Sequence, residues 1–235
     1  MRPGQAGAAL VLCAHGAADV RGRRTVSDLA AAVRHLRRDL HVELAFVDVQ
    51  PPAVGDVVDR LARQRPLVVV PLLLCGGYHV RVDVARAVAP WPAAASAGPL
   101  GPHPALTDLM RQRVVEAGGR PGDHVVVAAA GSSRPEATAD AQQVALDLGR
   151  TWPGRVTVGF GSAASPSATE AVETARRDGA GRVIIASYLL GHGFFHTKLT
   201  RAGADAVTEP LGAHPAVVQV VLARYAESVA ALQAD

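Results

Sequence analysis

The sequence predicts an α/β fold with an internal duplication: two tandem, doubly wound domains, each built on a four-stranded parallel sheet. Short runs rich in Val, Leu and Ala alternate with longer Ala-, Leu- and Arg-rich segments, a pattern typical of buried parallel strands separated by helices. Four segments of the first half recur in the same order in the second half. The 235 residues, 49% of them hydrophobic, are enough for two domains of ordinary size.

The duplication divides the chain into residues 1–120 and 121–235, with Pro121 and Gly122 at the predicted linker. We expect the first domain to carry the active site and the second to form a wall of the cleft. The matching segments are residues 10–16 and 125–131, 42–46 and 156–160, 68–74 and 183–189, and 98–104 and 209–215.

The elements of the first half follow from its apolar runs and its prolines. We expect strands at residues 8–14, 42–47 and 67–74, and a weak strand at 94–100. We expect helices at residues 26–39, 53–64, 82–88 and 104–117. Pro52 and Pro104 precede or open two of these helices, where a fixed φ and a missing N–H are tolerated.

Composition limits the class of partner. The formal charge of +3 and the pI of about 9.3 suit an anionic small molecule but are too weak to predict nucleic-acid binding. Cys13 and Cys75 have no metal-binding spacing, which favours a reduced, cytoplasmic protein. We expect no membrane partner, because no apolar run reaches the ~20 residues of a membrane helix. The chain is expected to be a monomer or a homodimer.

Three polar side chains each follow one of the first three predicted strands: His15, Asp48 and His79. In an open parallel sheet, the carboxyl ends of the strands form the edge at which ligands bind. Neighbouring strands lie about 4.8 Å apart, so side chains at this edge can converge on one ion. Two imidazoles and a carboxylate suit a divalent metal, and also proton transfer near neutral pH.

Each of these residues also has an ordinary structural explanation when it is taken alone. His15 is typical of a polar strand end, and Asp48 is typical of a turn or a helix cap. Gly76 and Gly77, which precede His79, let a backbone approach a ligand closely but also occur in flexible loops. Their combination at one edge of the predicted sheet is what favours a functional site.

The duplication provides an internal comparison for the candidate residues. The second-half positions that correspond to His15, Asp48 and His79 are, in that order, Ala130, Ser162 and either Phe195 or His196. The fold signals persist in the second half while the candidate ligands mostly disappear. This difference predicts one active site, in the first half, whose residues are not needed for folding.

His192 and His196 lie four residues apart, a spacing that can bind metal on a helix. Gly193 and the preceding predicted strand indicate a loop at this position instead. We therefore expect this segment to face a substrate and not to hold a metal.

The motifs of the first half resemble those of the sirohydrochlorin chelatases, the small class II chelatases of siroheme and cobalamin synthesis. The most specific motif is Gly-Tyr-His-x-x-x-Asp at residues 77–83. His-Gly at residues 15–16, Phe-Val-Asp at 46–48 and Gly-Pro-Leu-Gly-Pro-His-Pro at 98–104 add to it. The resemblance covers nearly the whole chain, because two-domain members carry the same duplication, and it implies a chelatase-like fold.

The resemblance implies a lyase that inserts ferrous iron or cobalt into sirohydrochlorin, with loss of the pyrrole protons; iron is slightly favoured. His15 and His79 would bind the metal and accept protons, and Asp48 occupies the position of the family's usual Glu. No organic cofactor is implied, and the divalent metal is a substrate. The residues expected to contact this anionic tetrapyrrole are Gly76, Gly77, Tyr78, Arg81, His192 and Lys198.

The chain also departs from the family's motifs. Where the family commonly reads His-Gly-Ser-Arg-Asp-Pro, residues 15–20 read His-Gly-Ala-Ala-Asp-Val, and Asp48 is one methylene shorter than Glu. A shift of about 1 Å at a reacting centre can cost on the order of 100-fold in rate. The alternatives are a cobaltochelatase and a non-catalytic protein that binds a tetrapyrrole or a metal. A two-lobed substrate-binding module would leave the paired histidines unexplained.

Overall fold

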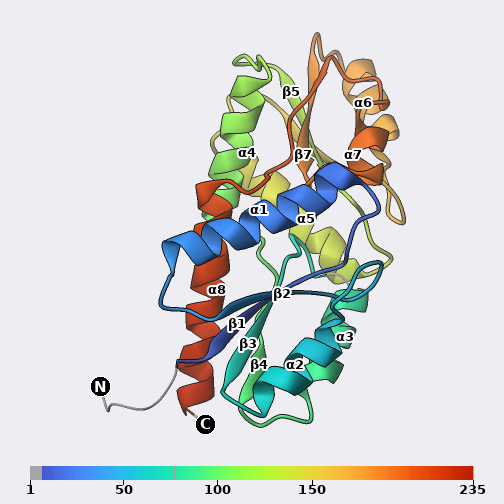
Figure 1. Ribbon diagram of the computed structural model, residues 1–235. Helices are drawn as coiled ribbons and strands as arrows, with labels where there is room; N and C mark the ends of the chain where they lie inside the picture. The colour runs from blue at the N-terminus through green and yellow to red at the C-terminus, as the bar shows by residue number, and fades with distance from the viewer. Residues whose placement is uncertain (1–6, 77, 235) are drawn as a thin grey trace.

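The computed structural model describes residues 7–76 and 78–234, with the side chains of residues 78–81 outside that description. Two four-stranded sheets have the strand orders β2-β1-β3-β4 and β6-β5-β7-β8, and every pairing is parallel. Helices flank both sheets (Figure 1). The predicted α/β architecture with two tandem parallel sheets is therefore confirmed.

The two halves have the same order of elements. The first half comprises β1 (Ala9–Ala14), α1 (Val20–Leu36), β2 (Val42–Phe46), α2 (Val54–Ala62), β3 (Leu67–Pro71), α3 (Tyr78–Val88), β4 (Ala94–Ser96) and α4 (Pro104–Glu116). The second comprises β5 (His124–Ala129), α5 (Pro135–Gly149), β6 (Val156–Phe160), α6 (Ala168–Arg177), β7 (Val183–Tyr188), α7 (Phe194–Leu199), β8 (Ala206–Val207) and α8 (Pro215–Ala234).

The central strand β1 shows why these apolar runs form parallel strands. All six of its residues are buried, because helices cover both faces of the sheet. Leu10 and Leu12 belong to the core between the two sheets, while Val11 and Cys13 belong to the core under α2 and α3. This alternation follows from the two-residue period of a strand.

Several element ends differ from the expected ones; β4, for example, ends at Ser96 and not at residue 100. Helix α1 begins at Val20 and not at residue 26, because the Asp19 carboxylate accepts hydrogen bonds from the N–H groups of Arg21 (2.7 Å) and Gly22 (3.2 Å). Helix α3 begins at Tyr78 and not at residue 82. Strand β3 ends at Pro71, and the apolar residues 72–74 form a loop that reaches the second half.

Helices α4 and α8 pack against the sheet of the opposite half. Helix α4 lies along β7 and α5, whereas α8 lies along β3, β4 and α1 (Figure 1). The Arg224 guanidinium on α8 donates a hydrogen bond to the Pro99 carbonyl (2.8 Å), and the Tyr225 hydroxyl donates one to the Ala8 carbonyl. The division at residue 120 therefore describes the sequence repeats, while these two helices join both halves into one continuous core.

Helix α8 also corrects the expectation about membrane-length segments. Its 20 residues are long and apolar enough to pass for a membrane span by length and composition alone. In the structure, Val217, Val221 and Tyr225 of this helix are buried in the core between the sheets. The apolar face of α8 thus packs against the protein core, as in other core helices.

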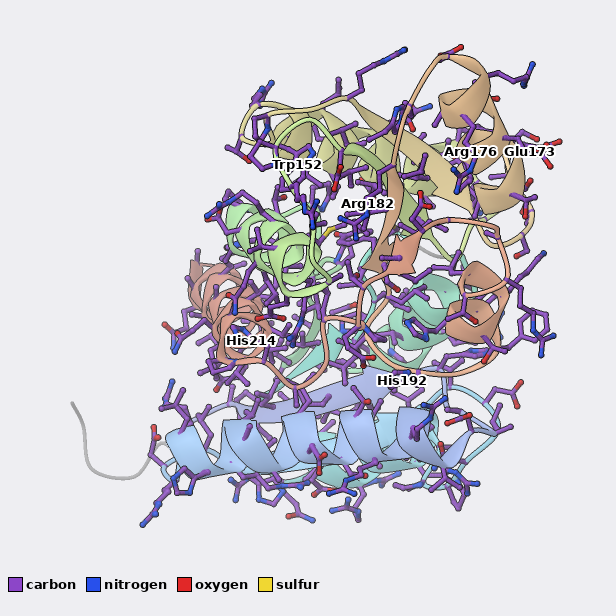
Figure 2. All side chains as sticks on the ribbon, turned by 90° about the horizontal axis from the view of Figure 1, so that it is seen from above. Trp152, Glu173, Arg176, Arg182, His192 and His214 are labelled. Atoms are coloured by element: carbon purple, nitrogen blue, oxygen red, sulfur yellow. The ribbon has the colours of Figure 1, made fainter. Side chains whose placement is uncertain are left out.

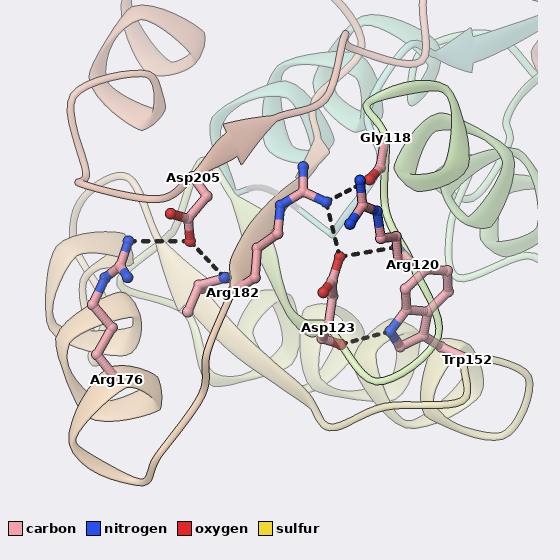
Figure 3. Close-up of polar contacts among 8 residues, drawn as sticks. Gly118, Arg120, Asp123, Trp152, Arg176, Arg182 and Asp205 are labelled. Carbon is pink, nitrogen blue, oxygen red and sulfur yellow. Dashed lines mark hydrogen bonds and ion pairs between the residues drawn. The ribbon is translucent and has the colours of Figure 1, made fainter.

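The linker between the halves is held at the amino ends of the second sheet's strands. The Arg182 guanidinium donates hydrogen bonds to the Gly118 carbonyl and to the Asp123 carboxylate (3.1 Å), which also accepts from the Arg120 N–H (2.9 Å; Figure 3). Trp152 donates its indole N–H to the Asp123 carbonyl (2.9 Å). These contacts fix residues 118–123 at the end of the sheet opposite to its carboxyl edge.

Candidate functional site

The first two loops of the predicted site meet at the carboxyl ends of β1 and β2. The Asp48 N–H donates a hydrogen bond to the His15 carbonyl at 3.1 Å. Gly16 has a φ of +103°, and a Cβ there would lie 2.3 Å from the Asp48 carbonyl oxygen. Only glycine fits such a close approach of two backbones, so Gly16 is required to bring His15 and Asp48 onto one edge.

His15 and Asp48 are both exposed at this edge. One Asp48 carboxylate oxygen accepts a hydrogen bond from the N–H of Val49 (2.7 Å), a residue with a positive φ of 65°. The other carboxylate oxygen has no hydrogen bond to any described residue. Asp48 thus both shapes its own turn, as a turn-forming Asp does, and leaves acceptor capacity at the edge.

The same turn recurs in the second half without the candidate ligands. Gly131 has a φ of +91°, and a Cβ there would meet the Ser162 carbonyl oxygen. The Ser162 N–H donates to the Ala130 carbonyl (2.9 Å), and Ala163 has a positive φ of 54°. The backbone geometry of the duplication therefore aligns Ala130 with His15 and Ser162 with Asp48, as the sequence predicted.

The third loop, after β3, shifts the predicted alignment by one residue. The sheet pairings place Leu67 opposite Ala9 and Val183 opposite His124, so Leu67 corresponds to Val183. The sequence comparison had matched Val183 with residue 68 instead. With the corrected register, Phe195 is the counterpart of His79, and no gap is needed.

Several predicted site residues lie partly or wholly outside the described residues. Gly77 is not described, and neither are the side chains of Tyr78, His79 and Arg81, whose backbone forms the first turn of α3. Gly76 is described, and its N–H donates a hydrogen bond to the Asp140 carboxylate of the second half at 2.9 Å. The described side chains form no group of three or more His, Cys, Asp or Glu that could hold a metal.

A cavity of about 250 Å³ lies between the loop after β3 and the carboxyl ends of β5 and β7. Its wall is mostly apolar and comes from both halves of the chain. It adjoins the third loop but includes neither His15 nor Asp48. The lining residues are Leu72, Leu73, Leu74, Cys75, Ala129, Ala130, Gly131, Ser132, Ala137, Tyr188, Leu189 and Leu190.

The two cysteines near the site are unsuited to metal binding. Cys13 is buried and Cys75 is half-buried, and both are free. Burial, with a smaller contribution from the Asp83 carboxylate, raises the pKa of Cys13 to about 12. Burial and the Asp140 carboxylate likewise raise the pKa of Cys75 to about 12. Both thiols are therefore protonated near neutral pH in the metal-free protein, whereas metals bind the thiolate.

His192 lies in the loop before α7, which packs against α1, whereas His196 lies on α7 itself, so the loop expected here ends at Gly193. The His192 ring pairs with Glu209 (2.8 Å) and lies edge-on to the His196 ring, with the ring centroids 4.7 Å apart. The buried His196 ring contacts the Thr208 carbonyl (3.1 Å), and Lys198 is exposed on α7. A Cβ on Gly22 of α1 would lie 2.7 Å from the His192 carbonyl, and Figure 2 shows His192 beside this helix.

Sequence reasoning missed the second-half residues that contact the third loop. The Tyr188 hydroxyl donates a hydrogen bond to the Leu74 carbonyl (3.0 Å), and Asp140 accepts one from Gly76. Neither residue lies in a motif, and each is more than 60 residues from its partner in the chain. Only the arrangement of the two halves reveals these contacts.

Solved structures with this arrangement provide the comparison with known proteins. SirB from Bacillus subtilis with Fe3+ has a TM-score of 0.82 at 20% identity, covering 97% of this chain and 98% of that one. The sirohydrochlorin chelatase SirB from Bacillus subtilis subspecies spizizenii, in complex with cobalt, has a TM-score of 0.78 at 18% identity, with coverages of 97% and 98%. These likenesses establish the fold.

CbiX, described as the terminal enzyme for biosynthesis of siroheme in denitrifying bacteria, has a TM-score of 0.69 at 25% identity and covers 95% of this chain and 98% of that one. A sequence search among curated proteins finds no significant match. The CbiX family model matches residues 9–117 and, a second time, residues 124–228, which together are most of the chain. The protein therefore belongs to the CbiX family, with two tandem copies of the family's unit.

Proposed function

We propose that this protein is a metal chelatase that inserts a divalent metal into sirohydrochlorin, with ferrous iron favoured over cobalt. Family membership supports this proposal, as does the similarity to SirB structures that hold Fe3+ or cobalt. The observation that carries it is the turn joining His15 to Asp48: the scaffold of this turn recurs in the second half, while its two polar side chains do not.

The second half supports the proposed position of His79. Its counterpart, Phe195, lies at the carboxyl edge of the second sheet. A Cβ on Gly161 would lie 3.0 Å from the Phe195 ring and 3.1 Å from the Ala130 carbonyl. Ala130 is the counterpart of His15. Since Phe195 and Ala130 both lie beside Gly161 in the second half, we infer that His79 and His15 serve one site in the first half.

The chemistry assigned to each residue follows from its side chain. Neutral imidazoles bind iron and cobalt readily, so His15 and His79 hold the incoming metal. Metallation of a tetrapyrrole releases the pyrrole protons, and the same imidazoles and the Asp48 carboxylate accept them. The first half thus carries the metal site, and the second half forms the wall of the cleft.

The tetrapyrrole binds between the halves in this proposal. In this proposal, one side of its apolar macrocycle lies against the mostly apolar cavity wall, while its acidic groups require cations at the edge. Arg81 and Lys198 pair with these carboxylates, and Arg provides the better bidentate partner. Gly76, Gly77 and Tyr78 line the substrate, and His192 borders it from the second half.

Absorption spectroscopy tests the proposal directly. The protein is mixed with sirohydrochlorin and Fe2+ or Co2+ without oxygen, and the spectral change on metallation is compared with the protein-free rate. We expect acceleration with the native chain and near-complete loss with His15→Ala or His79→Ala. His35→Ala is the matched control, because His35 is exposed in the last turn of α1, at the end of the helix away from residue 15.

The same experiment separates the alternatives. A higher rate with Co2+ than with Fe2+ would favour a cobaltochelatase. The binder alternative rests on Ala17 and Ala18, which stand where the family commonly has Ser and Arg. A spectral shift of sirohydrochlorin that saturates with protein, without faster metallation, would favour that alternative and contradict the enzymatic proposal. The absence of any spectral change would exclude this substrate.

A further inference from the structure

The loop that carries His79 is held by hydrogen bonds from the opposite half of the molecule. Between the end of β3 and the start of α3, the Leu74 carbonyl accepts a hydrogen bond from the Tyr188 hydroxyl (3.0 Å). Two residues later, the Gly76 N–H donates to the Asp140 carboxylate (2.9 Å). Tyr188 ends β7 and Asp140 lies on α5, so both contacts cross between the halves. His79 follows Gly76 by three residues.

The contact made by Tyr188 is a core contact. Its side chain is 1% exposed, and a Cβ on Gly101 would collide with the hydroxyl. A buried hydroxyl needs a hydrogen-bond partner, and the Leu74 carbonyl provides it. The position of Leu74 is therefore fixed by packing as well as by the hydrogen bond.

The Asp140 carboxylate makes its contact as a charged acceptor, whereas the residue at the equivalent position of the first half is neutral. Thr25 on α1 is the counterpart of Asp140, related to it by the same spacing that relates Gly16 to Gly131. Thr25 lies against Gly191 of the second half's third loop, where a Cβ would be 3.1 Å from the Thr25 hydroxyl. That hydroxyl donates to the Arg21 carbonyl of its own helix instead (3.1 Å).

The two loops therefore differ in how they are held. Among the described residues, a carboxylate–amide hydrogen bond from the opposite half occurs at the loop that leads to His79. The loop that leads to Phe195 is held within its own half, by the His192–Glu209 pair and by backbone hydrogen bonds to Leu189 and Leu190, and is only packed against the opposite half. Hydrogen bonds to a charged group are stronger than neutral ones and fix the direction of the N–H group. The carboxylate restraint that crosses between the halves is therefore at the loop that leads to the candidate metal ligand.

We propose that Asp140 is a positioning residue for metal insertion, assisted by Tyr188: it holds residues 74–76 of the first half, from which the chain continues to the candidate ligand His79. The inference rests on the proposed function and assigns to the second half a role beyond that of a wall. This role requires the two halves to be packed together, because Asp140 and Gly76 belong to different halves. Asp140 acts through the loop and does not touch the metal.

Steady-state kinetics with sirohydrochlorin and Co2+ test this role. Asp140→Ala removes the acceptor, and we expect kcat to fall at least about tenfold, as a small misplacement of a reacting group does, with KM for sirohydrochlorin changed less than about twofold. Asp140→Asn keeps an acceptor oxygen and should recover most of the rate. Thr25→Ala is the matched control on the other half and should keep the native kcat.

Hydrogen exchange of the same variants reports on the loop itself. In Asp140→Ala, amide exchange in residues 74–76 should become faster, while the β1 and β5 segments and the thermal midpoint stay near their native values. Unchanged loop exchange, or an unchanged kcat in Asp140→Ala while the native chain turns over, would overturn the inference. A kcat loss in Asp140→Asn as large as in Asp140→Ala would also overturn it. Lack of turnover by the native chain would instead contradict the proposed function, and every variant would then be equally inactive.

Discussion

Gly16 shows how one residue without a side chain shapes the candidate site. Its positive φ and its contact with the Asp48 carbonyl bring the loops after β1 and β2 together. The sequence predicted that His15 follows a strand, but it could not reveal the contact of Gly16 with Asp48, which is distant along the chain. Residue identity alone predicted the candidate site residues; the backbone contact that joins their two loops required the fold.

Replacing Gly16 by alanine should disrupt this turn. The new Cβ would lie 2.3 Å from the Asp48 carbonyl oxygen, so the backbone must shift. We expect the free energy of unfolding to fall by about 1–3 kcal/mol and the rate of metallation to fall with it. Urea denaturation and the absorption assay measure the two effects.

Gly55→Ala is the control for this substitution. Gly55 lies in α2 with no atom within 4 Å of its Cβ position, so alanine there should raise the free energy of unfolding by about 0.5–1 kcal/mol. Equal stability of the Gly16→Ala protein and the native protein would contradict the importance of the close approach.

His103 couples stability to pH at the start of α4. Its Nδ1 accepts a hydrogen bond from the Ala105 N–H (3.1 Å), which requires that nitrogen to be unprotonated. Burial, and then the Arg224 charge, lower the pKa of His103 below 6.5, against a smaller opposing effect of Glu227. The unfolded chain therefore binds the proton more readily than the folded one does. The stabilisation is complete above pH 6.5 and is lost as the pH falls toward the folded pKa.

The prediction is a smaller pH dependence in His103→Asn, because asparagine also caps helices but does not titrate in this range. The free energy of unfolding, measured by urea at about pH 7.5 and about pH 5.5, should change less in the variant than in the native protein. A residual change of the same sign is expected from His124, whose pKa is lowered mainly by burial. If the free energy of unfolding changed equally with pH in the two proteins, His103 would not contribute to the pH dependence of stability.

At the scale of elements, the apolar runs predicted the strands and their parallel pairing well, because a strand buried on both faces leaves a continuous apolar segment. They predicted the ends of β3 and α3 less well. Residues 72–74 are apolar because they line the cavity between the halves, so composition extended the strand too far. The packing of α4 and α8 against the sheet of the opposite half could not be predicted either, because an apolar helix face does not specify which sheet it covers.

A charge on the buried face of α8 tests whether this helix packs against the first sheet. Val221 is fully buried, and we expect Val221→Asp to lower the free energy of unfolding by on the order of several kcal/mol, because an unpaired buried carboxylate is costly. Because α8 packs on β3, amide exchange should increase first in β3 of the first half. Ala226→Asp, on the exposed face, should change stability by less than about 0.5 kcal/mol. Faster amide exchange confined to the second half would contradict the packing of α8 against the first sheet.

At the scale of the whole molecule, the duplication separates the backbone geometry of the turns, which recurs, from the candidate site residues, which do not. The two turns share their glycine, their backbone hydrogen bond and their positive φ, but the first half alone has His15 and Asp48 in them. The sequence predicted this asymmetry because it depends on aligned residues. It could not predict the hydrogen bonds from Asp140 and Tyr188, because these depend on how the two halves pack.

X-ray absorption of the protein loaded with one equivalent of Co2+ tests most directly whether two imidazoles from separate loops hold one metal. We predict scattering from two imidazole nitrogens in the native protein, from one in His15→Ala and from one in His79→Ala, with the His35→Ala protein unchanged. Absence of imidazole scattering in the native protein, or a spectrum unaffected by His15→Ala, would contradict the shared metal site.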